Sequence, residues 1–447
     1  MNWQQLLSSA RVGLEDAARR DDRTEFQRDY DRLIFSGPFR RLQNKTQVFP
    51  LPGSIFVHNR LTHSLEVSSV GRSLGNDSAR CLVERHPELA ATHILEMGSI
   101  VSAACLAHDL GNPPFGHSGE RAIATFFSEG EGQWLQIYRD PHTGESLTPQ
   151  QWNDLIHFEG NANSLRLLTH HFDGRRPGGF GMTYSTLASI VKYPYSSLQA
   201  GEHQKFGFFQ SEQNVYETIA HHLGIPQLGP SRYARFPLVY LVEAADDICY
   251  EIMDIEDAHK LLILSTADTL ALLKDYFDAD RRSQIDDYLS HMGVHDPGEQ
   301  VAYLRSCVIG LLEAECAKAF VAHEDEILAG TFEGTLIEQI SPRPREAYRA
   351  CVAMSYGHIY HSKYVVDIEL AGFKIMTFLT GLMLEAAIHP ERAYSQLLLN
   401  RVSPQYQLRS PHLYDRVMAV LDYISGMTDV YALDLYQKIT GVRVPRI

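Results

Sequence analysis

The sequence has few cysteines, and none of them are close together. No two cysteines form a CxxC pair, which argues against both a disulfide framework and a zinc ribbon. The six are Cys81, Cys105, Cys249, Cys307, Cys316 and Cys351. We therefore expect a protein of the reducing cytoplasm.

Long apolar runs and an export signal are also missing. The N-terminal segment MNWQQLLSSARVGLEDAARR has no apolar stretch after a basic start. No run approaches the roughly 18 apolar residues of a membrane-spanning helix. We expect a soluble chain that is neither exported nor bound to a membrane.

Positive charge is in deficit. The chain has 40 basic against 55 acidic residues, for a net charge of −15. This balance argues against wholesale attraction to nucleic acid or to an anionic membrane. Arg40, Arg41 and Lys45 have no acidic neighbours, however, and keep open a local contact with a nucleic-acid regulator.

Alternating valine and isoleucine runs are scarce, whereas apolar residues at helical spacing are frequent, so we predict an all-α protein. With 447 residues and 44% hydrophobic composition, the chain can bury a large core. Segments 128–155 and 173–181 are predicted loops. The region beyond about 260 carries amphipathic helices without a chemical motif. We therefore divide the chain into a core, 1–260, and a helical C-terminal extension, 261–447, packed on it. The expected helices are 61–83, 93–108, 118–128, 161–171, 233–253, 299–325 and 363–388.

The first candidate segment is RLTHSLE, residues 60–66. His63, Val67, Val70 and Leu74 share one stripe of a helix, so His63 faces inward. A histidine on an apolar stripe is either a hydrogen-bonded core residue or a ligand, and spacing alone leaves both interpretations open.

The second segment is ILEMGSIVSAACLAHDLGNPPFGHSGE, residues 94–120. His108 ends an apolar helical stripe, and Asp109 follows it just before Gly111 can end the helix. A buried His-Asp pair is costly unless the carboxylate meets a cation or strong donors, and a metal satisfies both residues. The prolines and glycines that follow form a tight turn, which delivers His117 and Glu120 beside the pair.

The third segment is FPLVYLVEAADDICYEIMDIEDA, residues 236–258. Asp246 and Tyr250 lie on its inward stripe. Asp246 is the better buried ligand, with Asp247 as the alternative. The remaining stripe, which water can solvate, is acidic and comprises Glu243, Asp247 and Glu251.

Two histidines and two carboxylates make a mixed nitrogen and oxygen site. Such a site suits Mn²⁺, Fe²⁺, Co²⁺ or, less naturally, Mg²⁺. It contains no cysteine, which disfavours a structural zinc. With open positions, it can polarise a phosphoryl oxygen and activate water, so we expect hydrolytic chemistry.

These segments resemble the HD superfamily of metal-dependent phosphohydrolases. More narrowly, FRRLQNKTQVFPL, RLTHSLEV, AHDLGNPPFGHSGE and LVEAADDICYEIMDIEDA resemble bacterial dGTPase-type triphosphohydrolases, relatives of the animal SAM and HD domain dNTPase. The resemblance spans roughly 25–260. It implies an all-α HD-domain fold and cleavage of a deoxynucleoside triphosphate (dNTP) into deoxynucleoside and inorganic triphosphate. It also implies a divalent metal, Mg²⁺ or Mn²⁺ first, with Fe²⁺ or Co²⁺ as alternatives.

The resemblance also implies roles for single residues. The metal ligands are His63, His108, Asp109 and Asp246. His117 matches the catalytic histidine, a general acid for the departing 5′ oxygen, and Glu120 would orient it.

Substrate contacts follow in the same way. Tyr250, Asp254 and Gln47 match residues that read the sugar 3′-OH, and a tyrosine under the ribose leaves little space for a 2′-OH. For the triphosphate we expect Arg60 and Lys192, because three phosphates need several charge-assisted donors.

One departure from the family and one further matching segment accompany these assignments. Asn112 stands where some relatives carry another histidine. The segment HFEGNANSLRLL, residues 157–168, also resembles the family, but Glu159 and His157 within it receive no role.

Two alternatives stay open. One is a nucleotidase or cyclic-nucleotide phosphodiesterase of the same superfamily, which would release a different product. The other is a nucleotide or nucleic-acid binding regulator with a relic site, against which the intact His117 and Glu120 argue. The resemblance further implies a homo-oligomer, a hexamer, and allows activation by a nucleotide or single-stranded DNA. Base preference cannot be read from the sequence.

Overall fold

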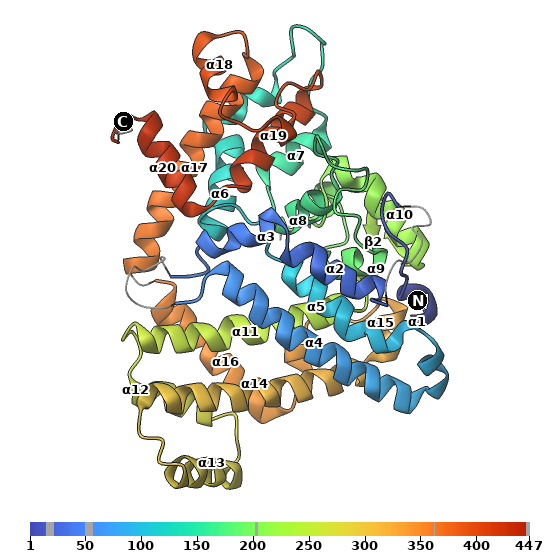
Figure 1. Cartoon of the computed structure of the whole chain (residues 1–447), viewed down its shortest axis with the longest axis vertical. Coiled ribbons are helices and arrows are strands. Elements are labelled where there is room, and N and C mark those ends of the chain that lie inside the picture. The colour runs from blue at the N-terminus through green and yellow to red at the C-terminus, as the bar shows by residue number, and fades with distance from the viewer. Residues whose placement is uncertain (15–21, 50–56, 202–203, 362, 444–447) are drawn as a thin grey trace.

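The chain folds into an assembly of helices, seen here in a computed structural model. The structure describes residues 1–14, 22–49, 57–201, 204–361 and 363–443. Pro50 and Leu51, which end the FRRLQNKTQVFPL segment, lie outside the described residues. In Figure 1, long helices lie across the lower half of the molecule, and a further long helix runs up one side toward the last helices of the chain.

The helices fall into two sequence groups. Those before residue 261 are α1 (Trp3–Leu6), α2 (Glu25–Ile34), α3 (Gly37–Arg41), α4 (Arg60–Arg85), α5 (Met97–Ala107), α6 (Gly116–Ser128), α7 (Pro149–Ile156), α8 (Gly160–Thr169), α9 (Tyr184–Ile190), α10 (Gln213–Leu223) and α11 (Val239–Lys260). Those after it are α12 (Thr266–Lys274), α13 (Ala279–His291), α14 (Pro297–Ala322), α15 (Glu324–Ala329), α16 (Pro342–Met354), α17 (Lys363–Ile388), α18 (Ala393–Leu399), α19 (Leu413–Ser425) and α20 (Asp429–Ile439). In the described residues, the strands are β1 (Gln227–Gly229) and β2 (Arg232–Tyr233), an antiparallel pair. The all-α prediction is confirmed.

Each expected helix has a counterpart, but both boundaries of the helix expected at 233–253 and the end of the loop expected at 128–155 were wrong. The helix expected at 233–253 is α11, which begins later, because Arg232 and Tyr233 pair with β1 instead. The expected loop 128–155 ends in α7. Thr148 caps this helix and forms a capping box with Gln151, a signal that is readable in the sequence. Residues 173–181 contain neither helix nor strand, as predicted.

The buried apolar side chains form two clusters, and both cross residue 260. In the first, Leu74 and Ile248 belong with Leu312; in the second, Phe126 belongs with Leu379 of α17 and with residues of α19. The division of the chain into two domains at residue 260 stays a prediction.

Helix α17 bears on the expectation that no helix of the chain spans a membrane. Within the described residues, the segment Val365–Ile388 is long and apolar enough to cross a membrane, with a mean hydropathy of 1.4. The segment meets this criterion by length and composition alone, and the charged residues Asp367, Glu369, Lys374 and Glu385 interrupt it, so it contains no uninterrupted run of 18 apolar residues. Because 56% of the apolar window is buried inside the protein, the segment has the burial of a core helix.

Close packing of α4 on α5 brings the candidate residues together. A Cβ atom on Gly75 would lie 2.8 Å from the Cα of Gly98, and one on Gly71 would lie 2.5 Å from Sγ of Cys105. Only glycine allows the helix backbones to approach this closely. His63 at the start of α4 therefore lies beside His108 at the end of α5.

Candidate metal centre and active site

Four side chains from three helices converge at one point. Nε2 of His63 lies 3.0 Å from Oδ1 of Asp246. Nε2 of His108 lies 3.5 Å from the same oxygen and 3.7 Å from Oδ1 of Asp109. The ligand atoms of His63, His108 and Asp109 all lie within 4.8 Å of one another. Ligands bound at about 2.0–2.2 Å to one ion lie about 3 Å apart, so the geometry fits a metal ion.

Neighbouring groups orient these four side chains. Nδ1–H of His108 donates to the carbonyl of Cys105 at 2.6 Å, which leaves Nε2 free to face the carboxylates. Oδ2 of Asp109 accepts from Arg60 at 2.5 Å, and Oδ1 accepts from Asn112 at 2.5 Å. Asn112 therefore holds the carboxylate of Asp109 in place.

The charges at this point favour a cation. Burial lowers the pKa of His108, but the carboxylates of Asp109 and Asp246 outweigh burial and raise the pKa to about 9. Burial raises the pKa of Asp246, yet His108 and His63 together hold it well below its ordinary value. The carboxylates thus stabilise positive charge, as the ligands of a divalent ion must.

His117 and Glu120 form a dyad. Nδ1 of His117 lies 3.0 Å from Oε2 of Glu120, and the other oxygen of Glu120 accepts from the backbone N–H of Gly160 at 2.9 Å. The hydrogen bond to Glu120 raises the pKa of His117. Glu120 is buried, whereas 71% of the His117 side chain is exposed. Nδ1 of the imidazole is therefore held by Glu120, whereas Nε2 is open.

Arg60 connects the dyad to the metal group. The turn before His117 has a left-handed backbone, with φ of 62° at Phe115 and 56° at Gly116. A Cβ atom on Gly116 would lie 2.6 Å from Nη2 of Arg60, so both the conformation and the space require glycine. The guanidinium that binds Asp109 thus also contacts the turn that carries His117.

Two of the predicted sugar contacts, Tyr250 and Asp254, lie on α11, and the third, Gln47, lies in the segment between η1 (Leu42–Asn44) and α4. The ring centroids of Tyr250 and His63 are 6.4 Å apart in an edge-on arrangement. Asp254 is buried and accepts from the hydroxyl of Tyr360 at 2.9 Å, and burial raises its pKa well above the ordinary range. Oε1 of Gln47 is buried and has no hydrogen-bond partner among the residues that the structure describes.

Two expectations about charged residues were wrong. Lys45 is not a surface cation, because it is 2% exposed and its Nζ donates to two backbone carbonyls, those of Asn112 and Ser425. The acidic stripe of α11 is not solvated either. Glu243 is 8% exposed and Glu251 is 3% exposed.

The acidic side chains of that stripe have partners, and one of these partners is Lys192, the predicted triphosphate contact. Nζ of Lys192 lies 2.9 Å from Glu243, which also binds Arg235 at 2.7 Å. Glu251 accepts from the hydroxyl of Ser355 at 2.6 Å. Lys192 is therefore paired with an acid one turn before Asp246.

Sequence reasoning missed two polar groups of this region. Nζ of Lys205 lies 2.7 Å from Glu159 and 3.9 Å from Oε2 of Glu120, so this cation stands beside the dyad. Glu159 was the available signal, since it belongs to the segment HFEGNANSLRLL. Tyr360 gave no signal, because it comes from the C-terminal region and follows a π-helix, η9 (Ser355–Ile359).

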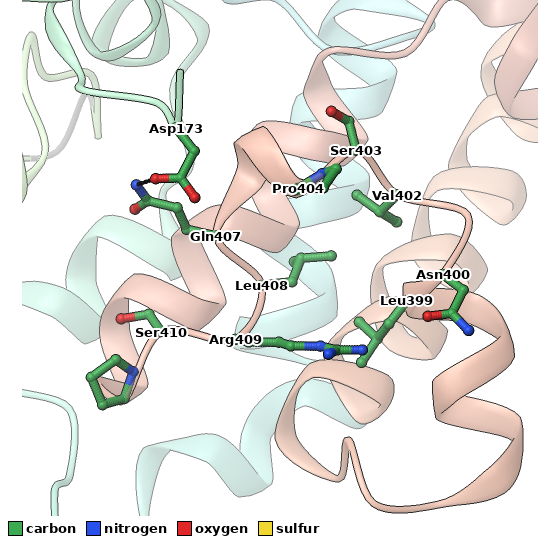
Figure 2. Close-up of a pocket in the computed structure, with 11 residues that line it drawn as sticks. Asp173, Leu399, Asn400, Val402, Ser403, Pro404, Gln407, Leu408, Arg409 and Ser410 are labelled. Atoms are coloured by element: carbon green, nitrogen blue, oxygen red, sulfur yellow. Dashed lines mark hydrogen bonds between the residues drawn. The ribbon is translucent and has the colours of Figure 1, made fainter. Parts of the chain in front are cut away.

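A separate pocket lies in the C-terminal region (Figure 2). It has a volume of about 650 Å³ and includes Arg409 and Leu408. One edge is closed by a hydrogen bond of 2.8 Å from Gln407 to Asp173. None of the predicted site residues lines it.

An all-α fold with a His, His-Asp and Asp group on three helices defines the HD class of hydrolases. Residues 60–149 match the HD domain family, and residues 339–438 match the phosphohydrolase-associated domain family. Proteins named deoxyguanosinetriphosphate triphosphohydrolase-like are similar over the whole chain. One from Synechocystis sp. is 39% identical, over 99% of this chain and all of the relative, and one from Pseudomonas aeruginosa is 38% identical, over all of both. A protein named deoxyguanosinetriphosphate triphosphohydrolase, from Yersinia enterocolitica, is 29% identical over 93% of each chain. The chain belongs to this deoxyguanosinetriphosphate triphosphohydrolase-like family and is an enzyme.

Proposed function

We propose that the chain hydrolyses deoxynucleoside triphosphates, dGTP among them, to deoxynucleoside and inorganic triphosphate in a metal-dependent reaction. One observation carries the proposal: an open, oriented imidazole, His117, stands beside a group of metal-binding side chains and is linked to it by Arg60. The full-length similarity to proteins with this name supports the choice of substrate class.

Four residues would hold the metal: His63, His108, Asp109 and Asp246. The family resemblance favours Mg²⁺ or Mn²⁺, and the two histidines of the donor set suit Mn²⁺, Fe²⁺ or Co²⁺ better than Mg²⁺. When bound, such an ion polarises a phosphoryl oxygen and neutralises its charge.

His117 supplies the proton in this proposal. Water adds to the α-phosphorus, and the bond from that phosphorus to the 5′ oxygen breaks. Nε2–H of His117 donates a proton to the departing 5′ oxygen, while Glu120 retains the hydrogen bond from Nδ1. One proton of the attacking water stays on inorganic triphosphate, and the other is released and replaces the proton that His117 gave up. The products are inorganic triphosphate and the deoxynucleoside, which accounts for every atom of the dNTP and one water.

Substrate binding uses the groups around this point. Tyr250, Asp254 and Gln47 would contact the sugar, and the buried free oxygen of Gln47 offers an acceptor for a hydroxyl. Arg60 and Lys205 would contact the triphosphate, because both lie beside the dyad. Lys192 would also contact the triphosphate, with its ammonium group leaving Glu243 to bind a phosphate.

The cellular setting is part of the proposal. All six cysteines are free in the described part of the chain, which fits a reducing cytoplasm. By resemblance we propose a homo-hexamer and a nucleotide or single-stranded DNA effector. Sedimentation with and without each effector tests both.

The activity test compares products. The purified protein is stripped of metal, resupplied with Mg²⁺ or Mn²⁺ and incubated with each dNTP, and the phosphates are separated by anion exchange. Inorganic triphosphate supports the proposal, whereas orthophosphate or a shortened nucleotide identifies a nucleotidase or phosphodiesterase. Absence of any product, with nucleotide still bound, identifies a binding regulator. His108→Ala is the matched variant, and we expect it to lose both metal and turnover.

A further inference from the structure

The turn that delivers His117 is held by residues from the far end of the chain. Asp429, the first residue of α20, is 6% exposed and accepts two backbone hydrogen bonds. Its Oδ1 accepts from the N–H of Phe115 at 2.9 Å, and its Oδ2 accepts from the N–H of Thr46 at 2.8 Å. Phe115 lies two residues before His117, and Thr46 directly precedes Gln47. One carboxylate therefore joins the two segments that carry these site residues.

The conformation of Phe115 needs such support. Its φ of 62° lies in the left-handed region, which a bulky residue adopts only when its surroundings impose it. Helix α17 adds a second constraint, because a Cβ atom on Gly372 would lie 2.6 Å from Cβ of Phe115. The hydroxyl of Ser118 also donates to the carbonyl of Glu369 in α17 at 2.8 Å. The turn is thus clamped from the C-terminal region on both sides of His117.

The end of α19 contributes a parallel set of contacts. Nζ of Lys45 donates to the carbonyls of Asn112 at 2.5 Å and of Ser425 at 2.8 Å. Nδ2 of Asn163 donates to the carbonyl of Gly111 at 2.7 Å and to the hydroxyl of Ser425 at 3.0 Å. Lys45 and Asn163 therefore bridge Ser425, at the end of α19, to one end of the turn from Gly111 to Phe115, and Asp429, at the start of α20, binds the other end.

We propose that Asp429 is a positioning residue that sets the direction of the His117 imidazole and the placement of Gln47, so that the α19–α20 connection completes the active site. The kinetic part of this inference rests on the proposed function. Removal of the carboxylate leaves two buried N–H groups without acceptors, and the left-handed turn then relaxes. A displacement of about 1 Å at a reacting group costs about 100-fold in rate.

The test compares Asp429→Ala and Asp429→Asn with Asp434→Asn, a control on the same helix whose carboxylate pairs with Lys438 at 2.5 Å near the surface. In Asp429→Ala we expect kcat to fall about 10- to 100-fold because His117 is displaced, and KM to rise because Gln47 is displaced, while Mn²⁺ affinity stays within about twofold. The alkaline limb of the pH profile moves to lower pH, because the His117 hydrogen bond to Glu120 weakens. Asp429→Asn keeps one carbonyl acceptor, so we expect its kcat and the position of its alkaline limb to lie between those of the wild type and of Asp429→Ala.

Two kinetic outcomes overturn the inference: an unchanged kcat in folded Asp429→Ala, or a parallel loss of kcat and metal affinity. If Asp429→Ala does not fold, Asp429→Asn decides, and a wild-type kcat and pH profile in that variant overturn the inference.

Backbone hydrogen exchange separates this inference from the activity. If the wild-type protein hydrolyses no dNTP, the proposed function fails. Hydrogen exchange alone then tests whether Asp429 holds the turn. Faster exchange over 110–118 and 44–48 in Asp429→Ala, with α14 unchanged, supports the clamp. Unchanged exchange in both segments overturns it.

Discussion

Nε2 of His63 and Oδ1 of Asp246 lie 3.0 Å apart, although 183 residues separate them in the chain. The two side chains come from α4 and α11, which pack directly against each other. Asp247 follows Asp246 but has other surroundings: burial, with the charges of Glu243 and Asp246, raises its pKa to about 8. The adjacent acids thus have different environments, and only Asp246 contacts both histidines.

This difference predicts unequal effects of two neighbouring substitutions. Asp246→Asn should lose metal binding and turnover by more than the roughly 10–100-fold typical of an outer-shell partner, because a charged ligand is removed. Asp247→Asn should keep both within that range. Mn²⁺ titration and steady-state rates measure the two effects. A larger loss in Asp247→Asn would make Asp247 the ligand.

His117→Ala should separate chemistry from metal binding. Its imidazole contacts Glu120 and none of the four proposed ligands, so we expect metal affinity to stay the same. The rate should fall by about 10²–10⁴-fold, the usual contribution of a general acid. If the variant no longer binds metal, His117 is instead a ligand.

Glu120→Gln should shift the pH dependence of the rate. The hydrogen bond to Glu120 raises the pKa of His117, so the protonated acid persists to higher pH in the wild-type protein. The rate falls as pH rises through that raised pKa. Without the carboxylate charge, the pKa returns toward about 6.5, and the alkaline limb moves to lower pH. An alkaline limb at the wild-type position in Glu120→Gln would show that His117 is not the group that titrates.

Tyr250→Ala should reduce the preference for deoxynucleotides. The ring of Tyr250 lies against His63 and occupies space where a 2′-OH would stand in the proposed complex. We expect the ratio of kcat/KM for dGTP over GTP to fall about tenfold or more. Competition between the two nucleotides measures this ratio directly, with Mn²⁺ affinity as the control. An unchanged ratio would place the selectivity elsewhere.

A buried ion pair joins α8 to α19 and predicts a loss of stability. Arg166 donates to both oxygens of Asp422, at 2.8 and 2.7 Å, and to Glu212 at 2.8 Å. Asp422→Ala removes two buried charge-assisted hydrogen bonds and leaves Arg166 with Glu212 as its remaining carboxylate partner. The loss of two such bonds should cost about 3–5 kcal/mol in free energy of unfolding.

The exposed pair of Arg349 and Glu338 supplies the control, since Glu338→Ala should cost about 1 kcal/mol or less. Urea unfolding gives both values. Equal losses in the two variants would contradict the buried-pair argument.

The local part of the site could be predicted from the sequence. His63, His108 and Asp246 lie on apolar helical stripes, and the 3.6-residue period places them inward without knowledge of the fold. Long-range partners could not be predicted. Thr46 and Asp429 are 383 residues apart, and no pattern in the sequence connects them.

The two errors about charge have a related cause. Lys45 has no acidic neighbour in the sequence and belongs to the basic cluster that kept a nucleic-acid contact open, but its partners are backbone carbonyls at a turn and a helix end. From the pattern of α11 alone, Glu251 was expected to face water. The residues that cover Glu251 follow α16, where the hydroxyl of Ser355 donates a hydrogen bond to its carboxylate. Tertiary packing supplies such partners, and periodicity within one helix does not reveal them.

The most direct test of the proposed reaction follows the oxygen of the attacking water. The purified protein is incubated with dGTP and Mg²⁺ in water labelled with oxygen-18, and the products are analysed by mass spectrometry. The mechanism predicts one labelled oxygen in inorganic triphosphate and none in deoxyguanosine, because water adds to the α-phosphorus. Label in deoxyguanosine, or orthophosphate as the first phosphate product, would contradict it.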